Sequence, residues 1–153
     1  MKFKLAGVFM AFLFCISMVG GSFAYASETC PTKLTDLTGH SIQKGQTATF
    51  HTTLWSETQT GFIKNSWSKV LNKPVTYSVS DSNNNVLFTE TKTTSTGWDG
   101  TMGETTFKVD TKSHGMDAGL YHITAKFNGV TNVGNTKDTY LPCEASVDLI
   151  VND

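Results

Sequence analysis

The chain has 153 residues and a formal net charge of −1 at pH 7, with 12 lysines against 13 acidic residues and no arginine. Arginine supplies most bidentate contacts to phosphates and bases, so its absence from a slightly acidic chain argues against nucleic acid as a partner. No basic cluster indicates an anionic membrane surface either.

The first 26 residues have the three parts of a secretory signal peptide. Lys2 and Lys4 form the positive start, residues 5–19 are apolar, and Ala24-Tyr25-Ala26 is a small-residue cleavage site. The apolar run is shorter than the roughly 18 to 20 residues that a membrane span needs. We therefore expect cleavage after Ala26, no membrane insertion afterwards, and a secreted, extracellular or periplasmic domain over residues 27–153.

Two cysteines, Cys30 and Cys143, remain near the ends of this mature domain. An exported chain meets oxidising conditions, in which paired cysteines form disulfides. A bond between them would close a loop of over 100 residues, and the chain-entropy model assigns such a loop roughly 4 to 5 kcal/mol. The alternative is a reactive or metal-binding pair, which lacks a Cys-x-x-Cys spacing and a nearby histidine.

Alternation of apolar and polar residues predicts seven strands, each with one buried face. In chain order they cover residues 32–38, 46–55, 73–79, 86–93, 104–110, 121–127 and 145–151. In the second of them the even-numbered residues from Ala48 to Leu54 face inward, and we expect Trp55 at its end to contribute to packing.

Turn and loop residues separate these strands. The run Asp81-Ser82-Asn83-Asn84-Asn85 is a strong hairpin signal, because Asn and Asp tolerate positive φ. Three longer connections, at 56–72, 97–103 and 128–142, show no sustained period, and long loops of this kind are often functional. With no amphipathic helix after the signal, the pattern predicts an all-β sandwich.

Three motifs resemble immunoglobulin-like domains. Asp117-x-Gly119-x-Tyr121 resembles the tyrosine corner, in which the tyrosine bonds back to upstream backbone, although Ile123 stands where antibody domains have a cysteine. The phrases Lys73-Pro74-Val75-Thr76-Tyr77 and Gly103-x-Thr105-x-Phe107-x-Val109 resemble those of bacterial and archaeal repeats of the adhesin or invasin type. The resemblance implies a seven-stranded, fibronectin type III-like β-sandwich.

The resemblance also implies how the strands divide between two sheets. One sheet takes residues 32–38, 46–55 and 104–110, and the other takes 73–79, 86–93, 121–127 and 145–151. The first and last strands run parallel and side by side in many such domains. That arrangement places Cys30 and Cys143 at matching ends.

No motif of catalysis or of cofactor binding is present. The sequence lacks a nucleophile elbow, a phosphate-binding loop, a dinucleotide fingerprint and a His-Glu-x-x-His site. Acidic residues are spread singly, so a paired-carboxylate hydrolase has no local signature. We expect a protein that is not an enzyme and that needs no cofactor.

Copper-handling periplasmic domains with immunoglobulin-like folds provide one alternative. His51 and His122 point outward from opposite sheets and cannot share a metal. His40 lies in one turn and His114 and Met116 in another, and both turns fall at the same end of such a sandwich. These three could form a copper site, and the competing interpretation is that they are unrelated loop residues, with Met116 closing the core.

The aromatic residues of the loops are the stronger functional lead. The implied topology gathers the three long connections at one end, where they carry Phe62, Trp67, Trp98, Met102 and Tyr140. Aromatic side chains on such loops supply rigid contact area at low entropic cost. We expect a ligand-binding surface for a protein or glycan there, and the alternative is that the tryptophans cover the open end of the core.

A third possibility is a small inhibitor of cysteine proteases. Some inhibitors with immunoglobulin-like folds carry a Thr-Thr-Gly-Tyr-x-Trp loop, and Thr58-Gln59-Thr60-Gly61-Phe62 echoes it in part, with Trp67 too far along. The expected function is therefore a secreted or cell-surface module for binding or adhesion, with the copper domain and the protease inhibitor as alternatives.

Overall fold

The computed structural model describes residues 27–58, 66–97, 100–134 and 137–153, so the expected signal peptide lies outside the described residues. Within these ranges the chain forms twelve β-strands, and no helix there is long and apolar enough to cross a membrane. The strands are β1 (Thr29–Cys30), β2 (Thr32–Thr35), β3 (His40–Gln43), β4 (Thr47–Thr58), β5 (Ser66–Lys69), β6 (Pro74–Asp81), β7 (Val86–Thr93), β8 (Glu104–Asp110), β9 (Gly119–Phe127), β10 (Val130–Val133), β11 (Asp138–Tyr140) and β12 (Cys143–Asn152).

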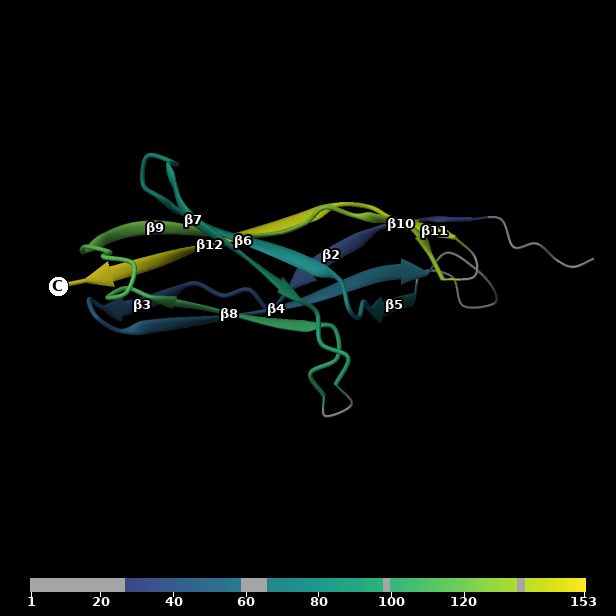
Figure 1. Cartoon of the computed structure of the whole chain (residues 1–153), viewed down its shortest axis with the longest axis horizontal. Coiled ribbons are helices and arrows are strands. Elements are labelled where there is room, and N and C mark those ends of the chain that lie inside the picture. The colour runs from purple at the N-terminus through teal and green to yellow at the C-terminus, as the bar shows by residue number, and fades with distance from the viewer. Residues whose placement is uncertain (1–26, 59–65, 98–99, 135–136) are drawn as a thin grey trace, which may run out of the picture.

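Two layers of strands run along the long axis of the molecule (Figure 1). In the first sheet, β4 pairs with β2 along one edge, while β8 and β5 follow one another along its other edge. In the second sheet the order is β3-β12-β9-β6-β7. This division of the strands is that of an immunoglobulin-like β-sandwich.

The segment predicted as a first strand and the turn after it forms two strands, one in each sheet. The predicted strand, residues 32–38, corresponds to β2, which pairs antiparallel with β4 in the first sheet. The chain then crosses over, and β3 pairs in parallel with the end of β12 in the second sheet. The crossover passes through Asp36, whose φ of 67° is one that aspartate tolerates. The prediction of a single strand over 32–38 followed by a turn is wrong in this respect.

The predicted number of seven strands is also too low. The seven expected strands correspond to β2, β4, β6, β7, β8, β9 and β12, whereas β1, β3, β5, β10 and β11 were not predicted. These five have two to four residues each, too few for a period of two to show. Three of them, β1, β11 and β10, form a small sheet of their own in which β1 and β11 run parallel.

The core lies between the two sheets and is centred on Phe107 of β8. The Phe107 ring stacks on the Tyr77 ring with centroids 4.7 Å apart and also lies near the rings of Phe50 and Phe88. The Tyr77 hydroxyl is buried and hydrogen-bonds to Thr105. The residues predicted to face inward on the second and third strands are all buried: Ala48, Phe50, Thr52, Leu54, Val75, Tyr77 and Val79.

The turn before β9 has the hydrogen bond of a tyrosine corner. The Tyr121 hydroxyl donates to the Asp117 carbonyl at 2.9 Å. The Asp117 carboxylate pairs with the Lys44 ammonium at 2.6 Å, which ties this turn to the loop between β3 and β4. Ile123, at the position of the antibody cysteine, is fully buried.

Cys30 lies in β1 and Cys143 begins β12, and both thiols are free in the structure. The Leu141 backbone N–H donates to the Cys30 carbonyl at 3.0 Å, and the Thr32 side chain hydrogen-bonds to the Cys143 thiol. Burial is the main cause that raises the pKa of each thiol. A protonated, buried thiol is a poor nucleophile, which argues against a reactive pair.

The hydroxyl of Thr52 provides a test of the core. Thr52 is buried, and its Oγ1 has no hydrogen-bond partner among the described residues. A Thr52→Val substitution keeps the shape of the side chain and removes an unsatisfied polar atom, so we expect the free energy of unfolding to rise by about 1 kcal/mol. Urea denaturation of both proteins measures the difference.

Thr105→Val is the matched control for this experiment. The Thr105 hydroxyl is also buried, but it is bonded to Tyr77. Its removal should lower the free energy of unfolding by about 1 kcal/mol. Equal effects of the two substitutions would contradict the assigned hydrogen bonding.

Candidate functional site

The outer face of the first sheet carries two tryptophans beside charged residues. Because side chains alternate along β4, Leu54 and Ser56 point into the core while Trp55 points outward. Trp55 is paired in register with Lys33 of β2 and Lys69 of β5, and the next outward position of β4 is paired with Trp67. We call this surface the tryptophan face, and it consists of Lys33, Asp36, Thr53, Trp55, Trp67 and Lys69.

Each indole ring has a lysine beside it. The Lys33 ammonium lies 4.0 Å from the centroid of the Trp67 ring, and the Lys69 ammonium lies 5.7 Å from that of Trp55. Both tryptophans are half-buried and belong to strands. Cation–π contacts at exposed sites contribute about 0.5 to 1 kcal/mol each. The rings are therefore held on a rigid sheet, and part of each remains open to a ligand.

A hydrogen-bond relay fixes the Trp55 ring. Its Nε1–H donates to the Thr35 hydroxyl at 2.9 Å, and the Thr35 hydroxyl donates to the Asp36 carboxylate at 2.8 Å. The Thr53 hydroxyl donates to the same carboxylate oxygen. The hydrogen bond from Thr53, followed by that from Thr35, lowers the pKa of Asp36. Asp36 is thus an ionised acceptor at neutral pH, placed next to an indole ring.

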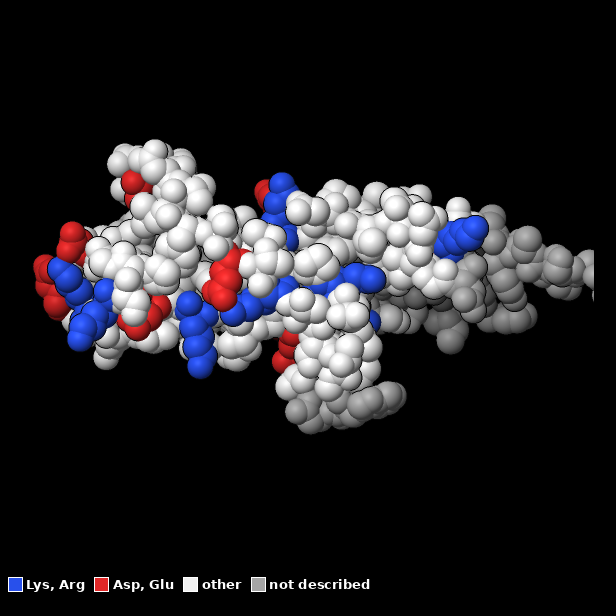
Figure 2. Space-filling model, in the orientation of Figure 1, with Lys and Arg blue, Asp and Glu red and all other residues white. Residues whose placement is uncertain are grey.

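A cavity of about 410 Å³ lies beside the tryptophan face, and each residue that lines it has a polar side chain. Its lining residues are His51, Lys92, Thr93, Ser95, Thr101, Glu104, Thr105 and Thr106, and we call it the polar cavity. The cavity lies where β8 and the end of β7 approach one another. In the view of Figure 2, lysine side chains form a row along the middle of the molecule, with carboxylates beside them.

Lys69 joins the polar cavity to the tryptophan face. Its ammonium pairs with the Glu104 carboxylate at 3.3 Å and donates to the Gly100 carbonyl at 3.3 Å. Gly103 makes this contact possible, because its φ is +72° and a Cβ there would lie only 2.8 Å from the Lys69 Cβ. The start of β8 is therefore packed directly against β5.

Three of the five residues that the sequence grouped at one loop end lie in the described ranges. Trp67 lies in β5 on the sheet face, Met102 lies in the turn before β8, and Tyr140 lies in β11 and packs against the core. Phe62 and Trp98 lie outside the described residues. The loop-end cluster therefore stays a prediction, and Trp67 is the member of it that lies on a sheet face.

The sequence predicts that Trp55 contributes to packing, and in the structure Trp55 lies half-buried on the outer face of β4. This outward position follows from the sequence, because Trp55 has the same alternation as His51 and Thr53. Asp36 was missed because its partners come from β2 and β4, which are joined only in the folded sheet.

Two of the three expected copper ligands, His40 and His114, pack against aromatic rings, and the third, Met116, is buried in the core. The His40 ring packs edge-on against Phe50, with centroids 4.9 Å apart, and the His114 ring stacks on Phe88 at 3.8 Å. Met116 is 3% exposed and belongs to the core. Among the described residues, no group of three or more His, Cys, Asp and Glu side chains could hold a metal ion.

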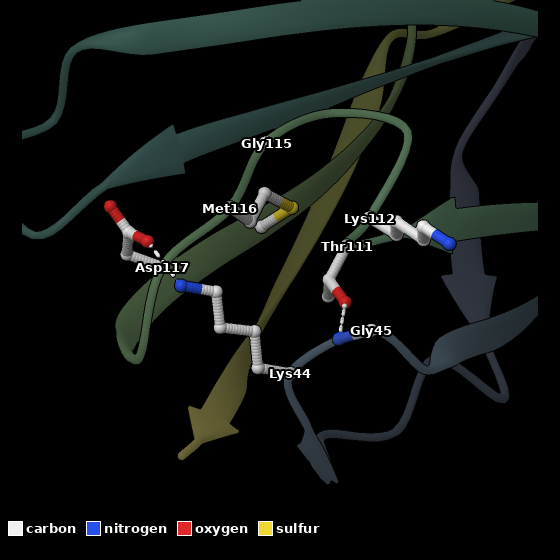
Figure 3. Close-up of a pocket in the computed structure, with 7 residues that line it drawn as sticks. All are labelled: Lys44, Gly45, Thr111, Lys112, Gly115, Met116 and Asp117. Carbon is white, nitrogen blue, oxygen red and sulfur yellow. Dashed lines mark hydrogen bonds and ion pairs between the residues drawn. The ribbon is translucent and has the colours of Figure 1, made fainter.

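A second cavity, of about 370 Å³, lies next to the tyrosine corner (Figure 3). It is lined by Lys44, Gly45, Thr111, Lys112, Gly115, Met116 and Asp117. Its polar groups are engaged with one another, since Lys44 pairs with Asp117 and the Gly45 N–H donates to Thr111 at 2.8 Å. These contacts brace the turns around the tyrosine corner.

No protein-family model matches this chain, and no curated protein matches it. One solved structure that is similar to it is the CARDB domain of the PF1109 protein from Pyrococcus furiosus, in complex with di-metal ions. The two are 13% identical, the match covers 86% of this chain and 99% of that chain, and the TM-score is 0.34. A likeness this remote carries no argument, so the fold assignment rests on the strand order.

The Asp36 relay predicts a dependence of stability on pH. The pKa of Asp36 in the folded state lies below its ordinary value of 3.8, so its contribution is present above that pH and is lost as the pH falls through the folded pKa. Asp36→Asn tolerates the same positive φ and removes the charge. We expect the substitution to lower the free energy of unfolding at pH 7 by less than about 1 kcal/mol, since the carboxyl is largely exposed.

Denaturation of both proteins between pH 7 and about pH 2 checks this prediction. The difference between them should shrink as the pH falls below the ordinary pKa of aspartate. A difference that stays constant over the whole range would show that the Asp36 charge is not linked to folding.

Proposed function

We propose that this chain is a secreted or cell-surface binding module of the adhesin-repeat type, which recognises a protein or a glycan through the tryptophan face. The module is not an enzyme and needs no cofactor for this role. Binding of this kind requires only shaped, rigid contact area and a few polar partners.

The observation that carries this proposal is the position of Trp67. It stands on the outer face of β5 with the Lys33 ammonium 4.0 Å from its ring, beside Trp55, and neither tryptophan belongs to the buried core. Large aromatic side chains dominate the energy of binding interfaces because they offer much contact area with few rotatable bonds. Two of them on neighbouring strands of one outward face form a platform that folding itself does not require.

Substitution of Trp67 by Ala tests the proposal. Glycan and cell-surface protein arrays should show a loss of affinity of about 30-fold or more, the size expected for a central binding residue. The free energy of unfolding should fall by about 1 kcal/mol or less, because the substitution mainly removes an exposed cation–π pair.

Leu87→Ala is the matched control. It also removes an exposed apolar side chain, which is 48% exposed, but it does so on β7 of the other sheet. This variant should bind like the original protein. A collapse of stability in Trp67→Ala with unchanged affinity would mean that Trp67 is structural and would refute the proposal.

We further propose that Cys30 and Cys143 form a disulfide in the exported protein. Two contacts support it: Leu141, two residues before Cys143, donates its backbone N–H to Cys30, and Thr32, two residues after Cys30, hydrogen-bonds to Cys143. Oxidation would tie the start of the domain to β12. The oxidised protein should be about 4 kcal/mol more stable than the double variant Cys30→Ala/Cys143→Ala. Thiol titration of the exported protein and melting with and without reductant measure this.

Reductant should not change the melting of the double variant, which serves as its own control. Two titratable thiols per chain in the denatured exported protein would show that the bond is absent.

A further inference from the structure

We propose that the ligand is an extended oligosaccharide, and that the polar cavity is a second subsite for the same chain that stacks on the tryptophan face. This inference rests on the proposed function, because it assumes that the tryptophan face binds. It adds the chemical class of the ligand and the direction in which the ligand lies.

The composition of the surface favours a glycan over a protein. The large aliphatic residues that are exposed in the described ranges lie elsewhere on the molecule: Val86, Leu87, Leu120, Leu141 and Ile150. Around the two indole rings the neighbours are lysine, glutamate, aspartate and threonine, and lysine, glutamate and aspartate are depleted in the centres of protein interfaces. Arginine, which is enriched in such centres, is missing from the whole chain.

The same composition suits a sugar. A pyranose presents a face of C–H groups and a rim of hydroxyls. The C–H face packs on an indole ring, whose negative π-surface attracts weakly positive hydrogens. The hydroxyl rim exchanges hydrogen bonds with carboxylates, ammonium groups and other hydroxyls. Asp36, ionised and fixed beside Trp55 by Thr35 and Thr53, is such a partner.

The polar cavity has complementary chemistry. Every residue that lines it has a polar side chain, and the carbon atoms of these side chains give the lining apolar surface as well, a mixture that suits the C–H groups and hydroxyls of a sugar. These groups are bonded to protein neighbours: Lys92 to Glu90, Glu104 to Lys69, Thr101 to Ser95 and Thr106 to His51. Ammonium, carboxylate and hydroxyl groups can each form more than one hydrogen bond, and a polyhydroxylated group could use the bonds that remain.

Register along β4 joins the two regions into one track. The residue paired with Trp67 is Glu57, and the outward positions that follow toward the cavity are Trp55, Thr53 and His51. Thr53 is buried and bonded to Asp36, so Asp36 forms the surface there, and His51 is paired with Thr106. Six residues of strand span about 20 Å. The Lys69 to Glu104 ion pair lies between the two regions. A single sugar cannot reach from Trp67 to His51, so occupation of both requires a chain.

The experiment measures how affinity depends on chain length. The probes are three size-graded series, of glucose, mannose and N-acetylglucosamine oligomers, from one unit to six. Tryptophan fluorescence and calorimetry report binding. We expect at least one series to bind, with an affinity that rises with each added unit until both regions are filled and then levels off.

Two variants remove hydrogen-bonding groups of the polar cavity without touching the tryptophans. His51→Ala and Thr106→Val change residues that are exposed on the sheet surface. Each should lower the affinity for the longest oligomer about 10-fold, the equivalent of one or two hydrogen bonds, and leave the shortest binding oligomer unaffected. Thr89→Val, an exposed threonine on β7, is the matched control and should change neither.

The outcomes separate this inference from the proposed function. If Trp67→Ala abolishes binding while the cavity variants keep the full length dependence, the second subsite is wrong and the binding face stands. If none of the three series binds but a surface protein binds through Trp67, the glycan class is wrong and the binding face again stands. If Trp67→Ala changes no binding on any array, both proposals fail together.

Discussion

The alternation of side chains along β4 is the constraint on which the rest of the structure depends. This strand pairs with β2, β8 and β5, so it organises the whole first sheet. Its inward residues, from Ala48 to Leu54, are buried against the second sheet. Successive side chains of a strand point to opposite faces, so each residue that points into the core has a neighbour that points outward. The twelve residues of β4 therefore contribute to both the core and the candidate site.

The outward residues of β4 are consequently held by the core beneath them. Trp55 cannot swing away without breaking its hydrogen bond to Thr35 or tilting the strand that buries Leu54. Lys69 is held in a similar manner, by Glu104 and by the close packing of Gly103. A site on a paired sheet loses little conformational entropy when it binds, in contrast with a site on long loops, and its contact area is ready before the ligand arrives.

The sequence predicts a strand well where the run of alternating apolar and polar residues is long. The ranges of β7 and β8 were predicted to the residue, and those of β4, β6, β9 and β12 to within a few residues, because seven or more alternating positions reveal a buried face. Short strands such as β3 and β5 carry too few positions for this, and their existence depends on partners that are distant in sequence. The sequence therefore predicts Trp67 as a ligand-binding residue but places it in a loop. The hydrogen bond from Thr53 to Asp36 could not be predicted, because it forms only when β2 pairs with β4.

The parallel pair of β3 and β12 has a mechanical consequence. The described chain starts near β1 at one end of the long axis and finishes with β12 at the other (Figure 1). A pull on these two ends, of the kind that a tethered molecule experiences in flowing liquid, would slide β3 along β12. The ladder from His40 to Gln43 would then bear the load across all its hydrogen bonds at once, instead of opening them one at a time. Such shear geometry suits a domain that has to remain folded while its ligand holds it under tension.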